Sequence, residues 1–192
     1  MVSSARAIDY AILLPRPVSK STTLTIACDS NWAGCRRTRK STTCFIIWVG
    51  HMMLTAQSKT QGFHALSSGE AEWYAATSGA AEGLYIMGLL TFFGWELEAR
   101  VFSDSSAARG IAGRQGVGKV RTLETRTLWL QAKVREGLVK VLAIAGKKNP
   151  ADLGTKALGS QRIQTLAAKA GVVVSVRGES IRHLVGVPPT EK

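Results

Sequence analysis

The chain has 192 residues, of which 45% are hydrophobic and 20% charged, a composition that excludes disordered and fibrous classes. Twenty-five Lys and Arg residues against thirteen Asp and Glu residues give a formal net charge of +12. This excess favours a polyanionic partner, a nucleic acid first and an acidic membrane surface second; a basic protein without such a partner is the alternative. No apolar run approaches the roughly 18 residues that a membrane span needs, so we expect no membrane insertion.

The cysteines show no pattern of a metal site or a disulfide framework. Cys28, Cys35 and Cys44 are odd in number and lack C-x-x-C spacing, and the three histidines are scattered along the chain. We therefore expect reduced thiols in an intracellular protein. The first ten residues lack a basic segment followed by an apolar core, so no secretory signal is expected.

The first half of the chain predicts strands. Residues 1–20 are weakly patterned and are expected to be a tail or the remnant of an upstream domain. Residues 22–28 alternate in polarity and are rich in β-branched side chains, which predicts a strand that ends at Asp29. Residues 41–50 and 52–59 predict two more strands. Because the links are short, the three strands are expected to form an antiparallel meander.

A long helix follows these strands. Ser67 and Glu70 have the spacing of a capping box, and the segment 71–93 after them is rich in alanine and leucine. Gly94 is expected to end this helix. The glycines inside it are tolerable where a helix packs closely on a sheet, although each costs about 1 kcal/mol against alanine.

The second half of the chain predicts a mixed α/β order. The expected elements are a strand at 98–103, a helix at 105–112, a basic loop at 113–121, an amphipathic helix at 123–136, a strand at 138–145 and a helix opened by Pro150. Together they predict a five-stranded mixed sheet, its first three strands antiparallel, flanked by helices within residues 21–158. A helix at 161–170 and a flexible tail are expected to be peripheral, within residues 159–192.

Aspartates stand at the ends of these elements. Asp29 and Asp104 each follow a strand, and Asp152 lies in the first turn after Pro150. Clustered carboxylates repel one another and are stable mainly beside a cation, and oxygen ligands suit Mg²⁺ or Mn²⁺. Two such ions about 4 Å apart can activate water and stabilise the leaving oxygen of a phosphodiester. The alternative is that each acid caps a helix or pairs with an arginine.

A glutamate of the long helix is expected to join them. Glu70 already has a local role as the capping-box partner of Ser67. Glu72 lies two residues further on, roughly 200° around the helix, and so faces another direction. Glu72 is therefore the predicted ligand.

Six motifs make the sequence resemble the ribonuclease H domain of copia-type LTR retrotransposon polyproteins. In chain order they are Asp29-Ser30-Asn31-Trp32-Ala33-Gly34, Thr38-Arg39-Lys40-Ser41-Thr42, Ser58-Lys59-Thr60-Gln61, Ala65-Leu66-Ser67-Ser68-Gly69-Glu70-Ala71-Glu72-Trp73-Tyr74-Ala75, Ser103-Asp104-Ser105-Ser106-Ala107 and Asn149-Pro150-Ala151-Asp152-Leu153-Gly154-Thr155-Lys156-Ala157-Leu158. The resemblance implies a ribonuclease H-like fold that cleaves the RNA strand of RNA–DNA hybrids during reverse transcription. It also implies two Mg²⁺ (or Mn²⁺) ions as cofactors.

The resemblance also implies roles for single residues. Asp29, Glu72, Asp104 and Asp152 fall on the four metal-binding catalytic positions. Asp29 is expected to bridge both ions, Glu72 and Asp104 to complete one site, and Asp152 to complete the other. The chain departs from the family pattern at Asn31, where Asp is common, at Cys44, where glycine is usual, and at Thr122, where a loop histidine is usual.

Basic and small polar residues near the expected site are candidates for contact with the nucleic acid. Cations can bind phosphates without reading sequence, and hydroxyl or amide groups can contact 2′-hydroxyls in the wide minor groove of a hybrid. Solvated surface loops are the alternative. The candidates are Ser30, Asn31, Arg36, Arg37, Arg39, Lys40, Thr42, Ser105, Lys119 and Arg121, with Lys147 and Lys148 as further cations.

Two other functions stay open. A catalytically decayed nucleic-acid-binding fragment of a polyprotein is favoured by Thr122 and by the lack of an upstream polymerase sequence. An integrase fits less well, because its catalytic core generally ends in Asp-x₃₅-Glu-like spacing. The expected partners are an RNA–DNA hybrid and a reverse transcriptase domain of the same polyprotein. The expected location is the cytoplasm, a virus-like particle or the nucleus.

Overall fold

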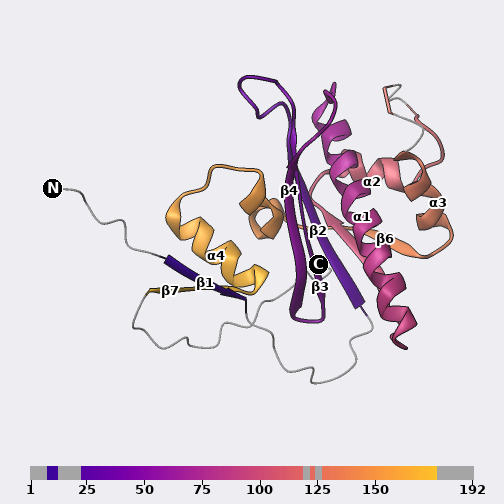
Figure 1. Cartoon of the computed structure of the whole chain (residues 1–192). Helices are drawn as coiled ribbons and strands as arrows, with labels where there is room; N and C mark the ends of the chain where they lie inside the picture. Colours follow the sequence, from indigo (N-terminus) through magenta and orange to yellow (C-terminus); the bar gives the residue numbers. More distant parts are fainter. Residues whose placement is uncertain (1–7, 13–22, 119–121, 124–126, 177–192) are drawn as a thin grey trace.

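A five-stranded mixed sheet forms the centre of the molecule, seen in a computed structural model that describes residues 8–12, 23–118, 122–123 and 127–176 (Figure 1). Its strands, in spatial order, are β4 (Met52–Thr60), β3 (Thr42–Val49), β2 (Thr23–Asn31), β5 (Glu98–Ser103) and β6 (Val139–Ala143). β2, β3 and β4, which follow one another in the chain, pair antiparallel, whereas β5 pairs parallel to both β2 and β6. The predicted α/β fold with a five-stranded mixed sheet is therefore confirmed.

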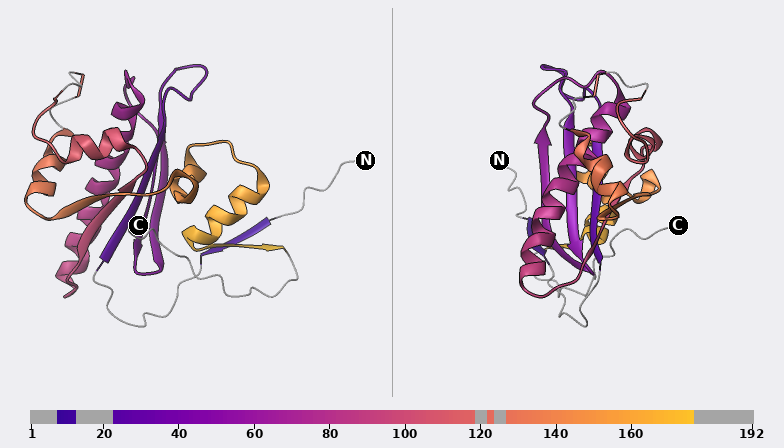
Figure 2. Two further views of the ribbon diagram at one scale, coloured as in Figure 1. Left: turned by 180° about the vertical axis from the view of Figure 1, so that it is seen from behind. Right: turned by 90° about the vertical axis from the view of Figure 1, so that its right-hand side faces the viewer.

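Helices cover both faces of this sheet (Figures 1 and 2). One face carries α1 (Ser68–Phe92), α2 (Ser106–Ala112) and α3 (Trp129–Arg135). The other face carries the 3₁₀ helix η3 (Pro150–Gly154), which follows the short η2 (Gly146–Lys148), and then α4 (Ser160–Ala170). Among the described residues, no helix has the length and hydropathy that crossing a bilayer requires.

The central strand β2 is buried on both faces because its side chains alternate between two cores. Leu24, Ile26 and Cys28 belong to the larger core beneath α1, whereas Ala27 belongs to the smaller core beneath η3 and α4. Gly79 allows α1 to lie close to the strand, since a Cβ there would stand 2.5 Å from the Cys28 sulfur. The glycine inside the long helix is thus explained by packing.

Two local predictions were wrong in detail. β2 does not end at Asp29, because its pairing with β3 continues to Asn31 opposite Thr42. The helix expected at 123–136 is shorter and covers Trp129–Arg135, with residues 124–126 outside the described part; Thr127 is instead held by a hydrogen bond from the Trp73 indole.

The helix opened by Pro150 is present, as a 3₁₀ helix of five residues. Its first residues are fixed to the sheet by Asn149, whose side chain accepts from Ala151 N and donates to Cys28 O. Its last residue, Gly154, is so close to Cys44 that a Cβ would lie 2.5 Å from the sulfur. The narrow space between these two contacts favours the tighter helix.

A second, two-stranded sheet was not predicted. Strand β1 (Ile8–Ile12), within the segment expected to be a tail, pairs antiparallel with β7 (Val172–Val176), which follows α4. In the left view of Figure 2 this pair lies beside α4, apart from the main sheet. The pairing joins residues 164 positions apart at its middle, Tyr10 and Val174, and no local sequence pattern reports such a partner.

Candidate metal centre and nucleic-acid surface

Three carboxylates meet at one end of the main sheet. Asp29 lies near the end of β2, Glu72 in the first turns of α1, and Asp104 directly after β5. One oxygen from each of the three lies within 4.8 Å of the others. β2 and β5 are parallel neighbours, so their carboxyl ends share an edge of the sheet, and α1 begins above that edge (Figure 1).

Glu72 is only partly compensated. Its Oε1 accepts a long hydrogen bond of 3.3 Å from the backbone N–H of Ser30, whereas its Oε2 is buried and has no hydrogen-bond partner among the described residues. Burial, and then the charges of Asp29 and Asp104, raise the pKa of Glu72 to about 8. Burial and the neighbouring negative charges outweigh the lowering effect of Lys156, so this carboxylate favours a cation beside it.

Asp29 is almost fully buried, at 1% exposure, but it has partners. Thr155 Oγ1 donates to its Oδ2, and the ammonium group of Lys156 lies 3.1 Å from its Oδ1. Burial still raises the pKa of Asp29 above its usual value, against the lowering effect of these two contacts. The site therefore combines Asp29, whose two oxygens both have partners, with Glu72, which has one buried oxygen without a hydrogen-bond partner in the described part of the chain.

Asp152 stands outside the group of three acids. Its Oδ1 lies 2.5 Å from the Lys156 ammonium, and its Oδ2 lies 3.3 Å from the Arg162 guanidinium. Lys156 therefore bridges Asp29 and Asp152. Although burial lowers the pKa of Lys156, the hydrogen bond to Asp152 and the charge of Asp29 raise it above the usual range.

The two glutamates of α1 face different surroundings. Ser67 caps the helix by accepting from Glu70 N at 3.1 Å, as the capping box predicts. The Glu70 carboxylate accepts from Leu66 N at 2.8 Å and from the Thr122 hydroxyl at 3.0 Å. Glu70 is thus satisfied within its own loop while Glu72 faces the other acids, which agrees with the choice of Glu72; its role as a ligand stays a prediction.

Sequence reasoning missed Asn149, Thr155 and Lys156 as parts of the site. All three lie in the motif around Asp152, and the spacing of Asp152 and Lys156 would have indicated an ion pair on one helix face. Their contacts with Asp29 and Cys28 span more than 120 residues and have no local signal.

The donor set fits a divalent cation. Asp29, Glu72 and Asp104 offer only oxygen ligands, and the buried Oε2 of Glu72 has no other partner in the described part of the chain. Hard cations such as Mg²⁺ and Mn²⁺ prefer oxygen ligands. The acidic group can therefore bind ions.

Among the candidate nucleic-acid contacts, three small polar residues already have structural partners or are buried. Asn31 Oδ1 accepts from Thr42 N at 2.6 Å, and its Nδ2 donates to Thr155 O at 2.8 Å. Ser30 is buried at 6% exposure. Ser105 caps α2 by accepting from Ala108 N at 3.2 Å. Their contacts with a nucleic acid stay predictions.

The basic candidates lie mostly on the loop between β2 and β3. Arg36, Arg37 and Arg39 are exposed, and the half-buried Lys40 donates from Nζ to Gly62 O at 2.9 Å. Lys119 and Arg121 lie outside the described residues.

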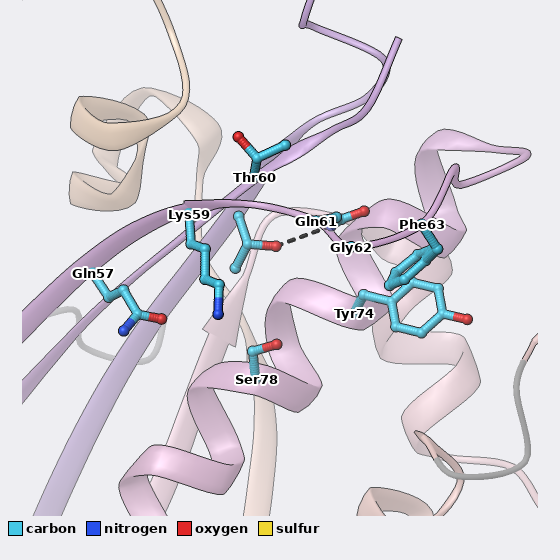
Figure 3. A pocket seen from close by; sticks show the side chains of 9 residues that line it. Gln57, Lys59, Thr60, Gln61, Gly62, Phe63, Tyr74 and Ser78 are labelled. Atoms are coloured by element: carbon cyan, nitrogen blue, oxygen red, sulfur yellow. Dashed lines mark hydrogen bonds between the residues drawn. The ribbon is translucent and has the colours of Figure 1, made fainter. Parts of the chain in front are cut away.

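A hollow of about 170 Å³ opens between strand β4 and helix α1 (Figure 3). Lys59 and Gln61 line the hollow on the strand side, and Tyr74 and Ser78 line it on the helix side. None of the four predicted metal ligands lines it. The acidic group and this hollow are therefore separate features.

Known proteins similar to this chain include Pol polyproteins of plant transposons. The chain is 30% identical over 147 residues to the retrovirus-related Pol polyprotein from transposon TNT 1-94 of Nicotiana tabacum, a match that covers 75% of this chain and 11% of that protein. The chain is related to transposon Pol polyproteins. It is also 26% identical over 147 residues to the Pol polyprotein from transposon RE1 of Arabidopsis thaliana, covering 75% of this chain and 10% of that protein.

This finding confirms the relationship that the motifs predicted. The chain spans about a tenth of the length of the curated Pol polyproteins it matches. No family model matches it. Among solved structures, the N-terminal RNase H domain of Rv2228c from Mycobacterium tuberculosis has a TM-score of 0.48 and 14% identity, covering 78% of this chain and 99% of that one.

Proposed function

We propose that this Pol-related domain is a ribonuclease H, which hydrolyses the RNA strand of RNA–DNA hybrids endonucleolytically during reverse transcription. The observation that supports it best is the meeting of Asp29, Glu72 and Asp104 at the carboxyl edge of β2 and β5, with an unpartnered oxygen on Glu72. The net charge of +12 supports a nucleic-acid substrate. A reverse transcriptase domain of the same polyprotein is the proposed partner.

The residues have distinct proposed roles. Asp29, Glu72 and Asp104 would hold one divalent ion, and Asp29 and Asp152 would hold a second. Bound Mg²⁺ or Mn²⁺ would activate water and stabilise the leaving oxygen of the phosphodiester. Lys156 pairs with both Asp29 and Asp152 before any ion binds. The arginines of the 33–41 loop would bind phosphates.

The test compares Asp29→Asn with the unchanged chain on a labelled hybrid. We expect Mg²⁺-dependent cleavage by the unchanged chain, and a variant that loses nearly all cleavage while still binding the hybrid. Arg109→Gln is a control on α2, because Arg109 donates to Ser103 O and, among the described residues, forms no ion pair with the three acids. Binding without any metal-dependent cleavage by the unchanged chain would contradict the enzyme proposal.

The second candidate is a nucleic-acid-binding fragment that no longer cleaves. Thr122 favours it, because its hydroxyl is bound to Glu70 at 3.0 Å, at the position where the resemblance implies a histidine. Under this alternative, the unchanged chain binds hybrids without cleaving them, and Asp29→Asn behaves in the same way. Thr122→His alone does not restore cleavage.

A further inference from the structure

Two large apolar side chains are exposed near the acidic group and have no role in the core. Trp32, directly after β2 and three residues beyond Asp29, is 53% exposed. Leu66, just before α1, is 67% exposed. Exposed large apolar side chains that gather at one place often mark a contact surface.

The indole of Trp32 is held in one orientation. Its Nε1–H donates to Ala65 O at 2.9 Å, so the ring is linked to the residue beside Leu66. Indole has a single polar group, and that group is already used. Trp32 therefore offers a ligand only the apolar surface of its ring.

The two loops that carry these side chains are tied together elsewhere. Lys40 Nζ donates to Gly62 O at 2.9 Å, and His64 Nε2 lies 2.8 Å from Thr38 O. We call Trp32 and Leu66, with the loops 32–41 and 61–67, the Trp32 platform.

The 61–67 loop is also anchored to the body of the domain (Figure 3). Gln61 Nε2 donates to Thr43 Oγ1 at 2.9 Å and to Ala71 O at 3.0 Å. The ring of Phe63 packs on Tyr74 with centroids 3.9 Å apart. The Trp32 platform is therefore preorganised, which reduces the entropy that a ligand must remove on binding.

The charge around the platform selects the kind of partner. From Ser30 to Leu66 the sequence contains no acidic residue, while Arg36, Arg37 and Arg39 are exposed on the 32–41 loop. Apolar surface beside exposed cations suits a ligand with apolar faces and phosphates. A nucleic acid has this combination, with sugar rings between its phosphates.

We propose that Trp32 and Leu66 pack against sugar rings in the minor groove of the RNA–DNA hybrid, beside the phosphodiester that is cut. Base faces are stacked inside a duplex, whereas an A-like hybrid presents its sugars in a wide and shallow minor groove. The flanking arginines bind the adjacent phosphates. This proposal rests on the proposed function and adds positioning residues for the hybrid.

The test measures hybrid affinity in EDTA, where hydrolysis does not interfere, by fluorescence anisotropy of a blunt RNA–DNA duplex. We expect Trp32→Ala to weaken binding about tenfold and Leu66→Ser about threefold, in the range of a lost aromatic contact. Trp32→Phe removes the indole N–H but keeps a ring, so it should recover most of the affinity. Ile163→Ser, at an exposed position of α4, is the control and should bind normally.

The outcomes separate the contact from its alternatives. Unchanged affinity of Trp32→Ala overturns the proposal, and so does a Trp32→Phe variant as weak as Trp32→Ala, because the indole hydrogen bond would then be what matters. A loss confined to duplexes with single-stranded overhangs overturns the groove assignment in favour of base stacking. If the unchanged chain cleaves hybrids and the Trp32→Ala variant binds them normally, only this inference is wrong. If the unchanged chain binds hybrids but never cleaves them, only the enzyme proposal is wrong.

Discussion

The ammonium group of Lys156 lies 3.1 Å from Oδ1 of Asp29, a residue 127 positions earlier in the chain. The same ammonium lies 2.5 Å from Asp152. One lysine thus neutralises the two acids that are proposed to share the second ion. Its charge lowers the pKa of Glu72 less than burial, Asp29 and Asp104 raise it, and the buried Oε2 of Glu72 has no hydrogen-bond partner among the described residues.

Lys156→Met should lower the free energy of unfolding of the metal-free chain by about 1–2 kcal/mol, since Asp29 would keep its burial and lose its cation. The value stays below that of a fully buried pair because the lysine side chain is 40% exposed. Urea unfolding in EDTA measures it. Lys140→Met, which removes a surface pair with Glu98, is the control and should change stability by less than about 1 kcal/mol. A stabilised Lys156→Met chain would contradict this reading of the bridge.

Glu72 should make stability depend on pH. Its pKa rises from an ordinary 4.5 to about 8 in the folded state, so the folded chain keeps a proton that the unfolded chain has lost. The free energy of unfolding therefore falls as pH rises from about 4.5 to about 8. Glu72→Gln should flatten this dependence and stabilise the metal-free chain at pH 9 by about 2 kcal/mol.

The measurement for Glu72 is urea unfolding in EDTA at several pH values between 4 and 9. Glu82→Gln on the same helix is the control and should leave the profile unchanged. If the free energy of unfolding of the Glu72→Gln chain falls with pH as steeply as that of the unchanged chain, another group causes the dependence. Mg²⁺ should stabilise the unchanged chain most at high pH, where Glu72 is ionised.

Asn149→Ala should destabilise the chain by about 2–3 kcal/mol. Asn149 is fully buried, and the substitution leaves the Cys28 carbonyl without its 2.9 Å hydrogen bond and the Ala151 N–H without its cap. Asn149→Asp keeps the cap acceptor and loses the donor, so it separates the two contacts. A loss below about 0.5 kcal/mol for both variants would show that η3 does not depend on this anchor.

Gly154 and Cys44 should be energetically coupled. A Cβ at position 154 would stand 2.5 Å from the Cys44 sulfur and 2.9 Å from its Cβ, so Gly154→Ala should destabilise by about 2 kcal/mol. Cys44→Gly removes both obstacles, and the double variant should lose less stability than the two single losses summed. A double-mutant cycle in urea measures this difference, and simple additivity would contradict the close contact.

Sequence patterns predicted the sheet because its strands β2, β3 and β5 are mostly buried. The alternation in residues 22–28 reports a strand directly, and the 200° between Glu70 and Glu72 follows from helix geometry alone. The predicted closeness of Asp29 and Asp104 needed only the parallel pairing of β2 with β5. These inferences depend on local periodicity, which a single sequence records.

The features that sequence reasoning missed depend on contacts between distant segments. Lys156 and Thr155 reach Asp29 only because η3 packs on the face of the sheet opposite α1. Within the expected helix at 123–136, Thr127 lies outside α3 and accepts a hydrogen bond from the Trp73 indole. No spacing within either segment reports its partner.

The pairing of β1 with β7 has a consequence for any shortened form of this chain. A fragment that starts at β2 would keep β7 but remove the strand that pairs with it along Val172–Val176. Without its partner strand, β7 would expose unpaired backbone donors and acceptors on a valine-rich segment. Such an edge can pair with strands of other chains. Removing the N-terminal segment would therefore lower solubility, because it exposes β7 in the distant C-terminal part of the chain.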